Sequence, residues 1–158
     1  MKVIEGDRSA RPFRFALVVS SYHDFVTDRL QRGAIDALTG AGADPDAMVV
    51  IRVPGSFEIP LAAQYAAESG DFDAIVCLGC LIKGETPHFE IIAGAVAQGL
   101  TAAAAATGVP MAFGVLTTLS VEEALARAGD GPGNKGREAA EAAVRMAAIA
   151  AQMTRAGR

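Results

Sequence analysis

The residues best suited to chemistry lie in the segment 77–90, which reads CLGCLIKGETPHFE. His88 is one of two histidines in the chain, and an imidazole can transfer a proton near neutral pH. Just before it, Gly84, Glu85 and Thr86 supply backbone N–H groups and a hydroxyl that can hold an oxyanion or phosphate. The segment therefore combines a proton carrier with an anion site. It also fits an ordinary surface turn that leads into a helix, and both interpretations stay open at this point.

Other candidate ligand contacts follow the apolar runs nearer the amino terminus. Tyr22 is suited to stacking on a planar ring, although an aromatic side chain here also commonly packs at a helix entry. The Pro-Gly turn that precedes Ser56 can present the N–H groups of Ser56 and Phe57 to a ligand. Glu58 can accept hydrogen bonds from ligand hydroxyls, or can simply favour the first turn of a helix. Each residue has a plain structural explanation when it is taken singly.

The carboxyl-terminal half adds an aromatic residue and two cations. Phe113 lies midway along a predicted strand that leads to Thr117. Arg127 and Lys135 flank the glycine-rich break 129–134, and cations beside such a break suit a phosphate. Isolated surface cations are usually just solvated, so these two residues are candidates only in combination with the others.

The two cysteines, Cys77 and Cys80, have the C-x-x-C spacing of redox and zinc sites. Here they fall within a predicted strand, where side chains three residues apart point to opposite faces. We therefore expect two buried, reduced thiols that do not meet, and no metal site.

Apolar periodicity alternates between strand and helix along the chain. The predicted strands are 15–20, 48–53, 74–82 and 111–116, and the predicted helices are 25–41, 57–69, 90–107, 121–128 and 135–153. Strands that alternate with helices favour a parallel sheet covered on both faces. We predict a three-layer α/β/α sandwich with a four-stranded, doubly wound, flavodoxin-like sheet. Because the loops after parallel strands meet at one edge, the candidates after each strand should gather there.

Length and composition indicate one globular domain, 13–158, preceded by an arm, 1–12, that is flexible or pairs with a neighbouring subunit. Hydrophobic residues make up 51% of the 158 residues, and the apolar excess predicts a homo-oligomer. A net charge of −4 without a basic stripe argues against nucleic-acid binding. We find no apolar stretch of membrane-spanning length and no signal peptide, so we expect a cytoplasmic protein without a membrane partner.

Four segments, taken together, resemble the lumazine synthase family. They are 53–63 (VPGSFEIPLAA), 78–90 (LGCLIKGETPHFE), 113–118 (FGVLTT) and 133–136 (GNKG), in this order and spacing. The resemblance implies condensation of 5-amino-6-(D-ribitylamino)uracil with L-3,4-dihydroxy-2-butanone 4-phosphate to 6,7-dimethyl-8-ribityllumazine. This is the penultimate step of riboflavin biosynthesis, and it uses no metal or organic cofactor.

The resemblance also assigns roles to single residues. His88 matches the proposed proton carrier, and Tyr22 matches the aromatic residue that stacks on the pyrimidine. The remaining matches to the ribitylaminouracil site are Ser56, Phe57, Glu58, Cys80, Leu81, Ile82 and Phe113. The matches to the butanone phosphate site are Glu85, Thr86 and Arg127, with Lys135 as a possible addition. Three departures stand out, because the family commonly has Phe or Trp at Tyr22, Asn at His23 and Ala at Ser56.

The resemblance further implies that Phe113, Arg127 and Lys135 reach into the site of an adjacent subunit. The assembly would be a pentamer, and the short turn 129–134 favours joining of pentamers into an icosahedral shell. Riboflavin synthase is then a candidate partner. Two alternatives belong to other classes, namely a flavin- or lumazine-binding protein and a purely structural shell subunit. A low-activity paralogue is a third, and His88, Thr86 and Arg127 together favour the enzyme.

Overall fold

The computed structural model describes residues 1–156 and contains one parallel sheet of four strands. The strands are β1 (Phe15–Ser20), β2 (Met48–Val53), β3 (Ala74–Ile82) and β4 (Met111–Thr118), in the spatial order β2-β1-β3-β4. β1 to β3 have the predicted bounds. β4 is two residues longer than predicted, because Thr117 and Thr118 pair with Leu81 and Ile82 of β3.

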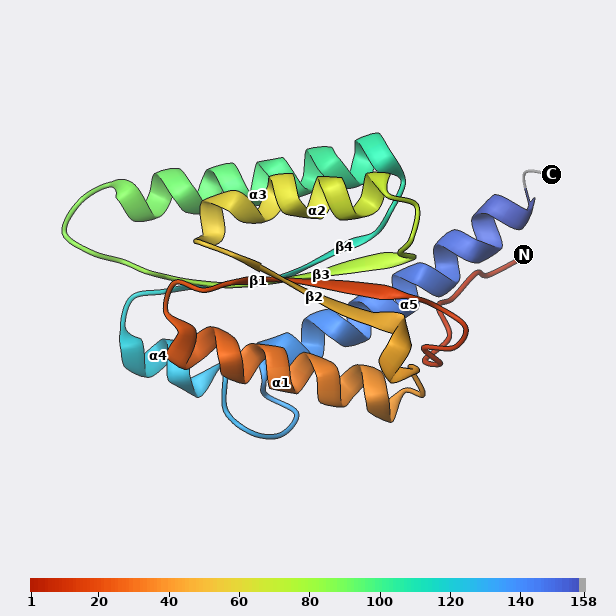
Figure 1. The fold of residues 1–158 in the computed structure, drawn as a ribbon, viewed down its shortest axis with the longest axis horizontal. Coiled ribbons are helices and arrows are strands. Elements are labelled where there is room, and N and C mark those ends of the chain that lie inside the picture. The colour runs from red at the N-terminus through yellow and green to blue at the C-terminus, as the bar shows by residue number, and fades with distance from the viewer. Residues whose placement is uncertain (157–158) are drawn as a thin grey trace.

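Helices cover both faces of the sheet, which confirms the predicted three-layer sandwich (Figure 1). They are α1 (Asp24–Gly40), α2 (Ile59–Glu68), α3 (His88–Thr107), α4 (Val121–Ala126) and α5 (Lys135–Ala156). Short 3-10 turns, Pro45–Ala47 and Ser56–Glu58, precede β2 and α2. α2 and α3 lie on one face, and α1, α4 and α5 lie on the other (Figure 1).

The two core clusters, one on each face of the sheet, account for the cysteines. Cys77 packs in the cluster below α2 and α3, whereas Cys80 packs in the cluster below α1 and α5. Both thiols are free and buried, and burial raises the pKa of Cys77 to about 12. The strand geometry therefore separates the two sulfurs, as predicted from their spacing.

The amino-terminal arm packs against its own chain. Ala10 is fully buried in the core cluster below α1 and α5, and its N–H donates to the carbonyl of Ala41 at 3.0 Å. Nearer the amino terminus, the carbonyl of Glu5 accepts a hydrogen bond from Nε2 of Gln152 in α5 at 2.9 Å. Residues 1–12 thus run beside α5 and contribute to the core, which the sequence did not indicate. Pairing of the arm with a neighbouring subunit stays a prediction.

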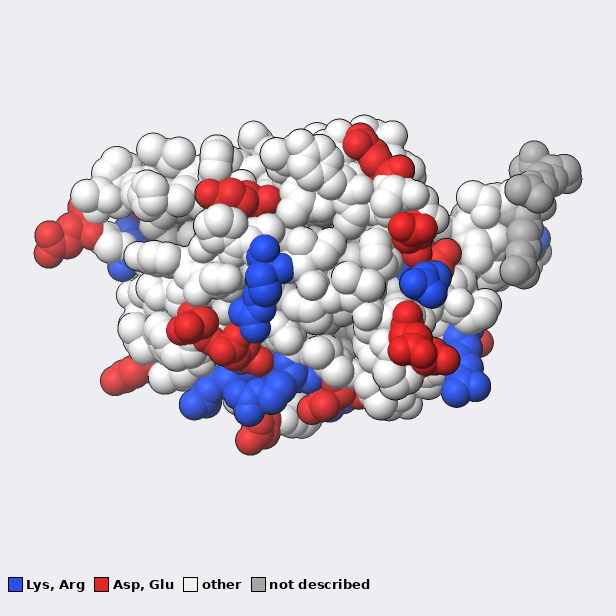
Figure 2. All heavy atoms as spheres, viewed as in Figure 1, with Lys and Arg blue, Asp and Glu red and all other residues white. Residues whose placement is uncertain are grey.

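α3 overturns one expectation. By length and composition its 20 residues could cross a membrane, although we expected no such stretch. Only 17% of its apolar window is buried within this chain. The surface over α2 and α3 also shows few charged side chains, whereas most of the charges in view lie over α1 (Figure 2). α3 therefore exposes much of its apolar sequence at the surface of this chain.

Candidate active site

A cavity of about 810 Å3 opens at the carboxyl ends of β1, β2 and β3. These are three of the four strand ends whose loops the sequence predicted to meet at one edge of the sheet. Its lining consists of Tyr22, His23, Gly55, Ser56, Phe57, Glu58, Leu81, Ile82, Gly84, Thr86, His88, Phe89, Ile91, Ile92 and Val121. Eight of these residues were predicted site residues. The side chains are mostly apolar, with one phenol, two imidazoles, two hydroxyls and one carboxylate, which suits a planar ligand with polar edges.

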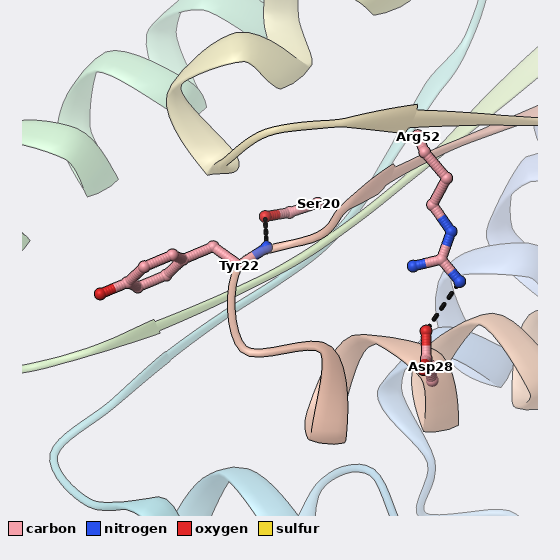
Figure 3. Close-up of polar contacts among 4 residues, drawn as sticks. All are labelled: Ser20, Tyr22, Asp28 and Arg52. Atoms are coloured by element: carbon pink, nitrogen blue, oxygen red, sulfur yellow. Dashed lines mark hydrogen bonds and ion pairs between the residues drawn. The ribbon is translucent and has the colours of Figure 1, made fainter.

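Tyr22 is placed in the cavity by the way β1 ends. The hydroxyl of the buried Ser20 accepts a hydrogen bond from the backbone N–H of Tyr22 at 3.2 Å (Figure 3). The next amide, that of Ser21, donates to the carbonyl of Val53 at 2.8 Å and ties the turn to the end of β2. The Tyr22 ring then projects beyond the sheet and is 64% exposed (Figure 3). Its face is therefore available to a ligand.

His23 joins this turn to α1 and brings a second imidazole to the cavity. It has a left-handed backbone, with φ 57° and ψ 49°, and its side chain makes no capping hydrogen bond to the helix. Its ring instead contacts the rings of Tyr22 and Phe25 edge-on, at centroid distances of 4.4 Å and 5.7 Å. Burial lowers the pKa of His23 from its ordinary value, so this imidazole is neutral at neutral pH.

The 3-10 turn Ser56–Glu58 forms the wall between β2 and α2. Ser56 is only 5% exposed, and its buried hydroxyl makes no hydrogen bond to another described residue. The turn lies directly on β3. A Cβ built on Gly79 would stand 2.7 Å from Oγ of Ser56 and 3.0 Å from Cδ1 of Ile59. Glycine at position 79 therefore lets the turn approach the sheet and sets the position of Phe57 and Glu58.

The loop between β3 and α3 carries the predicted anion site and the proton carrier. Lys83 fixes both ends of this loop, because its amide donates to the carbonyl of Thr118 at 2.9 Å and its Nζ pairs with Glu90 at 3.1 Å. The pKa of Glu90 is lowered, first by a hydrogen bond from its own backbone and then by Lys83. Thr86 and His88 both face the cavity. His88 is the first residue of α3, and the positive end of a helix dipole favours a bound anion there.

Three more predicted residues gather in a separate hollow of about 300 Å3 beside β4. We call it the β4 hollow, and its lining includes Phe113, Thr117, Arg127, Lys135 and Glu138. β4 is an edge strand, and α5 forms the opposite wall. The β4 hollow shares no lining residue with the cavity. Phe113 is 51% exposed, so its ring presents an open face.

The glycine-rich break holds the two cations of the β4 hollow together. The amide of Lys135 donates to the carbonyl of Arg127 at 2.8 Å and closes the loop between α4 and α5. Inside the loop, the buried Asn134 donates to the carbonyls of Arg29 and Gly129 at 3.2 Å and 3.0 Å. Residues 131–136 (GPGNKG) have the G-x-G-x-x-G spacing of dinucleotide sites, but they follow a helix rather than a strand. The loop therefore positions cations and lacks the setting of a dinucleotide fingerprint.

Two predicted residues do not line either surface. The side chain of Cys80 is fully buried in the core cluster below α1 and α5, outside the lining of the cavity. Glu85 is exposed in the loop that leads to α3, outside the lining. Sequence reasoning did not select the apolar contacts of Phe89, Ile91, Ile92 and Val121. Phe89, Ile91 and Ile92 could have been found from the sequence, because they follow His88 in the first turns of α3.

Comparison with known proteins identifies the family of this chain. Residues 12–151 match the family model described as 6,7-dimethyl-8-ribityllumazine synthase. The chain belongs to this family. It is 49% identical over 146 residues to the 6,7-dimethyl-8-ribityllumazine synthase of Salinibacter ruber, an alignment that covers 92% of this chain and 94% of the relative. It is 47% identical over 146 residues to the enzyme of the same name from Chlorobium luteolum, with the same coverage of both chains.

Both the cavity and the β4 hollow lie within the region that matches the 6,7-dimethyl-8-ribityllumazine synthase family. The matched region spans every strand and all the predicted site residues, from Tyr22 to Lys135. The predicted identity of the family is thus confirmed over most of the chain. The roles of the individual residues stay predictions, and the structure shows which of these residues line the same surface.

Proposed function

We propose that this protein is an enzyme of riboflavin biosynthesis that forms 6,7-dimethyl-8-ribityllumazine from 5-amino-6-(D-ribitylamino)uracil and L-3,4-dihydroxy-2-butanone 4-phosphate. The observation that carries the proposal is the meeting of Tyr22, Ser56 and His88 in one cavity, in a chain that belongs to this family. A flat aromatic face, the backbone N–H groups of the Ser56 turn and an imidazole that can transfer protons are what the uracil and its amine require.

The reaction joins an amine to a ketone and then closes a ring. The 5-amino group attacks the ketone carbonyl, and water leaves to give an imine. Loss of the proton on C3 converts the imine to an enamine, which expels phosphate from C4 and leaves an enol. The enol tautomerises to a ketone at C3, and the ribitylamino nitrogen on C6 attacks this ketone with loss of another water. Each step needs a proton transfer or a fixed geometry. His88 carries the protons in our proposal, and the amino end of α3 with Thr86 holds the phosphate. No metal or organic cofactor takes part in this proposed sequence.

We infer that a complete site needs two subunits. Phe113, Arg127 and Lys135 lie in the β4 hollow, away from the cavity, so one chain supplies two incomplete halves. In an oligomer, Phe113 would cover the ring bound on Tyr22, and Arg127 would pair with phosphate. The largely unburied apolar sequence of α3 supports this association, since burial of such a surface favours assembly.

We further propose a homopentamer, with pentamers that join into an icosahedral shell in the cytoplasm. The support for shell formation is the short turn Gly129–Asn134, which is fixed by the hydrogen bonds of Asn134 and sets the direction of α5. Riboflavin synthase is the proposed partner, because it would consume the lumazine. Sedimentation of the purified protein at neutral pH tests the assembly, and a single pentamer-sized species at micromolar concentration would contradict the shell but leave the enzyme proposal intact.

The catalytic proposal is tested by mixing both substrates with the purified protein and following lumazine fluorescence. The shared site is tested by complementation. His88→Ala and Arg127→Ala are each assayed alone, and are then unfolded, mixed and refolded together. If the site is shared, a fraction of mixed interfaces combines two intact halves, and activity rises above that of either variant. The double variant His88→Ala/Arg127→Ala, mixed with folded wild-type protein without refolding, is the control for subunit exchange. No gain in the refolded mixture would place both residues in the site of one chain.

A further inference from the structure

His23 has an unusual backbone for a residue at the start of a helix. Among the described residues it is the only non-glycine residue with a positive φ. A left-handed backbone is costly for most side chains, although His is among the types that adopt it more often. A residue that precedes a helix usually contributes a capping hydrogen bond, and the His23 side chain makes none. The His23 side chain therefore packs against its aromatic neighbours and does not cap the helix.

The ring of His23 is held between two aromatic rings. The interplanar angle with Tyr22 is 63° and that with Phe25 is 83°, which are edge-to-face arrangements with favourable quadrupole contact. Tyr22 itself is largely exposed, and its phenol oxygen has no hydrogen-bond partner among the described residues. His23 is thus the aromatic contact that restrains the orientation of the Tyr22 ring.

We propose that His23 is a positioning residue that fixes the plane of Tyr22, so that the ring of 5-amino-6-(D-ribitylamino)uracil stacks on a pre-oriented face. The inference rests on the proposed function and adds a residue that neither holds the phosphate nor carries protons. Without the His23 ring, Tyr22 would rotate about its side-chain bonds, and binding of the uracil would have to restrict that rotation. The butanone phosphate, held at the amino end of α3, would not be affected.

A double-mutant cycle on the full-length oligomer tests this role. The dissociation constant for the ribitylaminouracil is measured at equilibrium, without the second substrate, for wild type, His23→Asn, Tyr22→Ala and the combined variant. Asn also tolerates the left-handed backbone, so His23→Asn removes the ring with little strain. We expect His23→Asn to weaken uracil binding roughly 3- to 10-fold, the range of an aromatic pair, and to leave KM for the butanone phosphate unchanged.

The cycle separates positioning from direct contact. If His23 acts through Tyr22, His23→Asn has no further effect in the Tyr22→Ala background. Phe25→Ala, which removes the support behind the imidazole, should reproduce a smaller part of the loss. Tyr65→Ala is the matched control, because Tyr65 is also 64% exposed but lies on α2 outside the cavity lining. It should leave uracil binding unchanged.

Two outcomes would overturn the role of His23. An equal loss from His23→Asn in both backgrounds would mean that the imidazole contacts the ligand directly or acts elsewhere. An unchanged dissociation constant would mean that it does not orient Tyr22. A wild-type protein that binds the uracil yet forms no lumazine would overturn the proposed function while the cycle still reports on His23. A wild-type protein that does not bind the uracil would overturn both.

Discussion

The cavity at the strand ends and the β4 hollow differ in chemistry and in what holds them in place. The cavity is built from three loops that converge where β1, β2 and β3 end, and it contains the aromatic ring, the hydroxyls and His88. The β4 hollow contains Phe113 with two cations, and it lies along an edge strand. In the proposed reaction, the cavity binds the planar uracil and His88 transfers the protons. The β4 hollow has the groups that cover a ring and pair with an anion, but no proton carrier.

The contacts that hold the cavity and the β4 hollow in place also differ. The cavity depends on contacts close to the sheet, such as the hydroxyl of Ser20 on the Tyr22 amide and the approach of Ser56 to Gly79. The β4 hollow depends on a loop between two helices, closed by the hydrogen bond from Lys135 to Arg127. Substitutions in the cavity and in the β4 hollow should therefore have different effects on kinetics and stability. Measuring these effects tests whether the two regions are halves of one site.

The largest effect is expected at the proton carrier of the cavity. His88→Ala should slow lumazine formation by about 10-fold to a few hundred-fold, because water replaces a general acid–base group in an open site. Single-turnover fluorescence measures this rate directly, and added imidazole should restore part of it. An unchanged single-turnover rate would remove His88 from the mechanism and leave the cavity a binding surface.

The next effect should arise in the β4 hollow and should be selective for one substrate. Arg127→Ala should raise KM for the butanone phosphate about 10-fold or more, because a charge-assisted contact to phosphate is lost, and should change KM for the uracil far less. Arg32→Ala removes an exposed cation of α1 outside both linings and serves as the control. Equal increases for both substrates would show that Arg127 does not bind the phosphate.

A third substitution tests the support of the cavity wall. Gly79→Ala should destabilise the fold by about 1–3 kcal/mol, because its Cβ would overlap Ser56 and Ile59. Displacement of the Ser56–Glu58 turn should also raise KM for the uracil but not for the butanone phosphate. Denaturant unfolding and steady-state kinetics measure the two effects. Gly94→Ala in α3 is the control, since a Cβ there meets nothing within 4 Å. Wild-type stability for Gly79→Ala would mean that the turn moves freely.

The smallest effect concerns pH and His23. Burial holds the pKa of His23 below its ordinary value of 6.5, so the unfolded chain binds a proton more readily than the folded one. Stability should then fall as pH drops from 6.5 through the folded pKa. Calorimetry at pH 7.5 and pH 5.5 should show that wild type loses more thermal stability than His23→Asn, which lacks this titration. A larger loss in the variant would reverse the sign and refute the assignment.

Much of the cavity could be predicted from the sequence because it depends on local order. Apolar periodicity predicted the bounds of β1, β2 and β3, and parallel strands bring the loops after them to one edge. The alternation of side chains along β3 also predicted that Cys77 and Cys80 lie on opposite faces.

The sequence by itself determined the layers, the strand-end cluster and the family, since these depend on periodicity and motif spacing within short segments. Only the tertiary structure decided that Phe113, Arg127 and Lys135 form a hollow of their own, because that depends on β4 being an edge strand. The left-handed backbone of His23, the packing of Ala10 into the core and the exposure of α3 were likewise set by long-range contacts. The physical reason is that residue order specifies local conformation, whereas side-chain surroundings arise only when distant segments pack together.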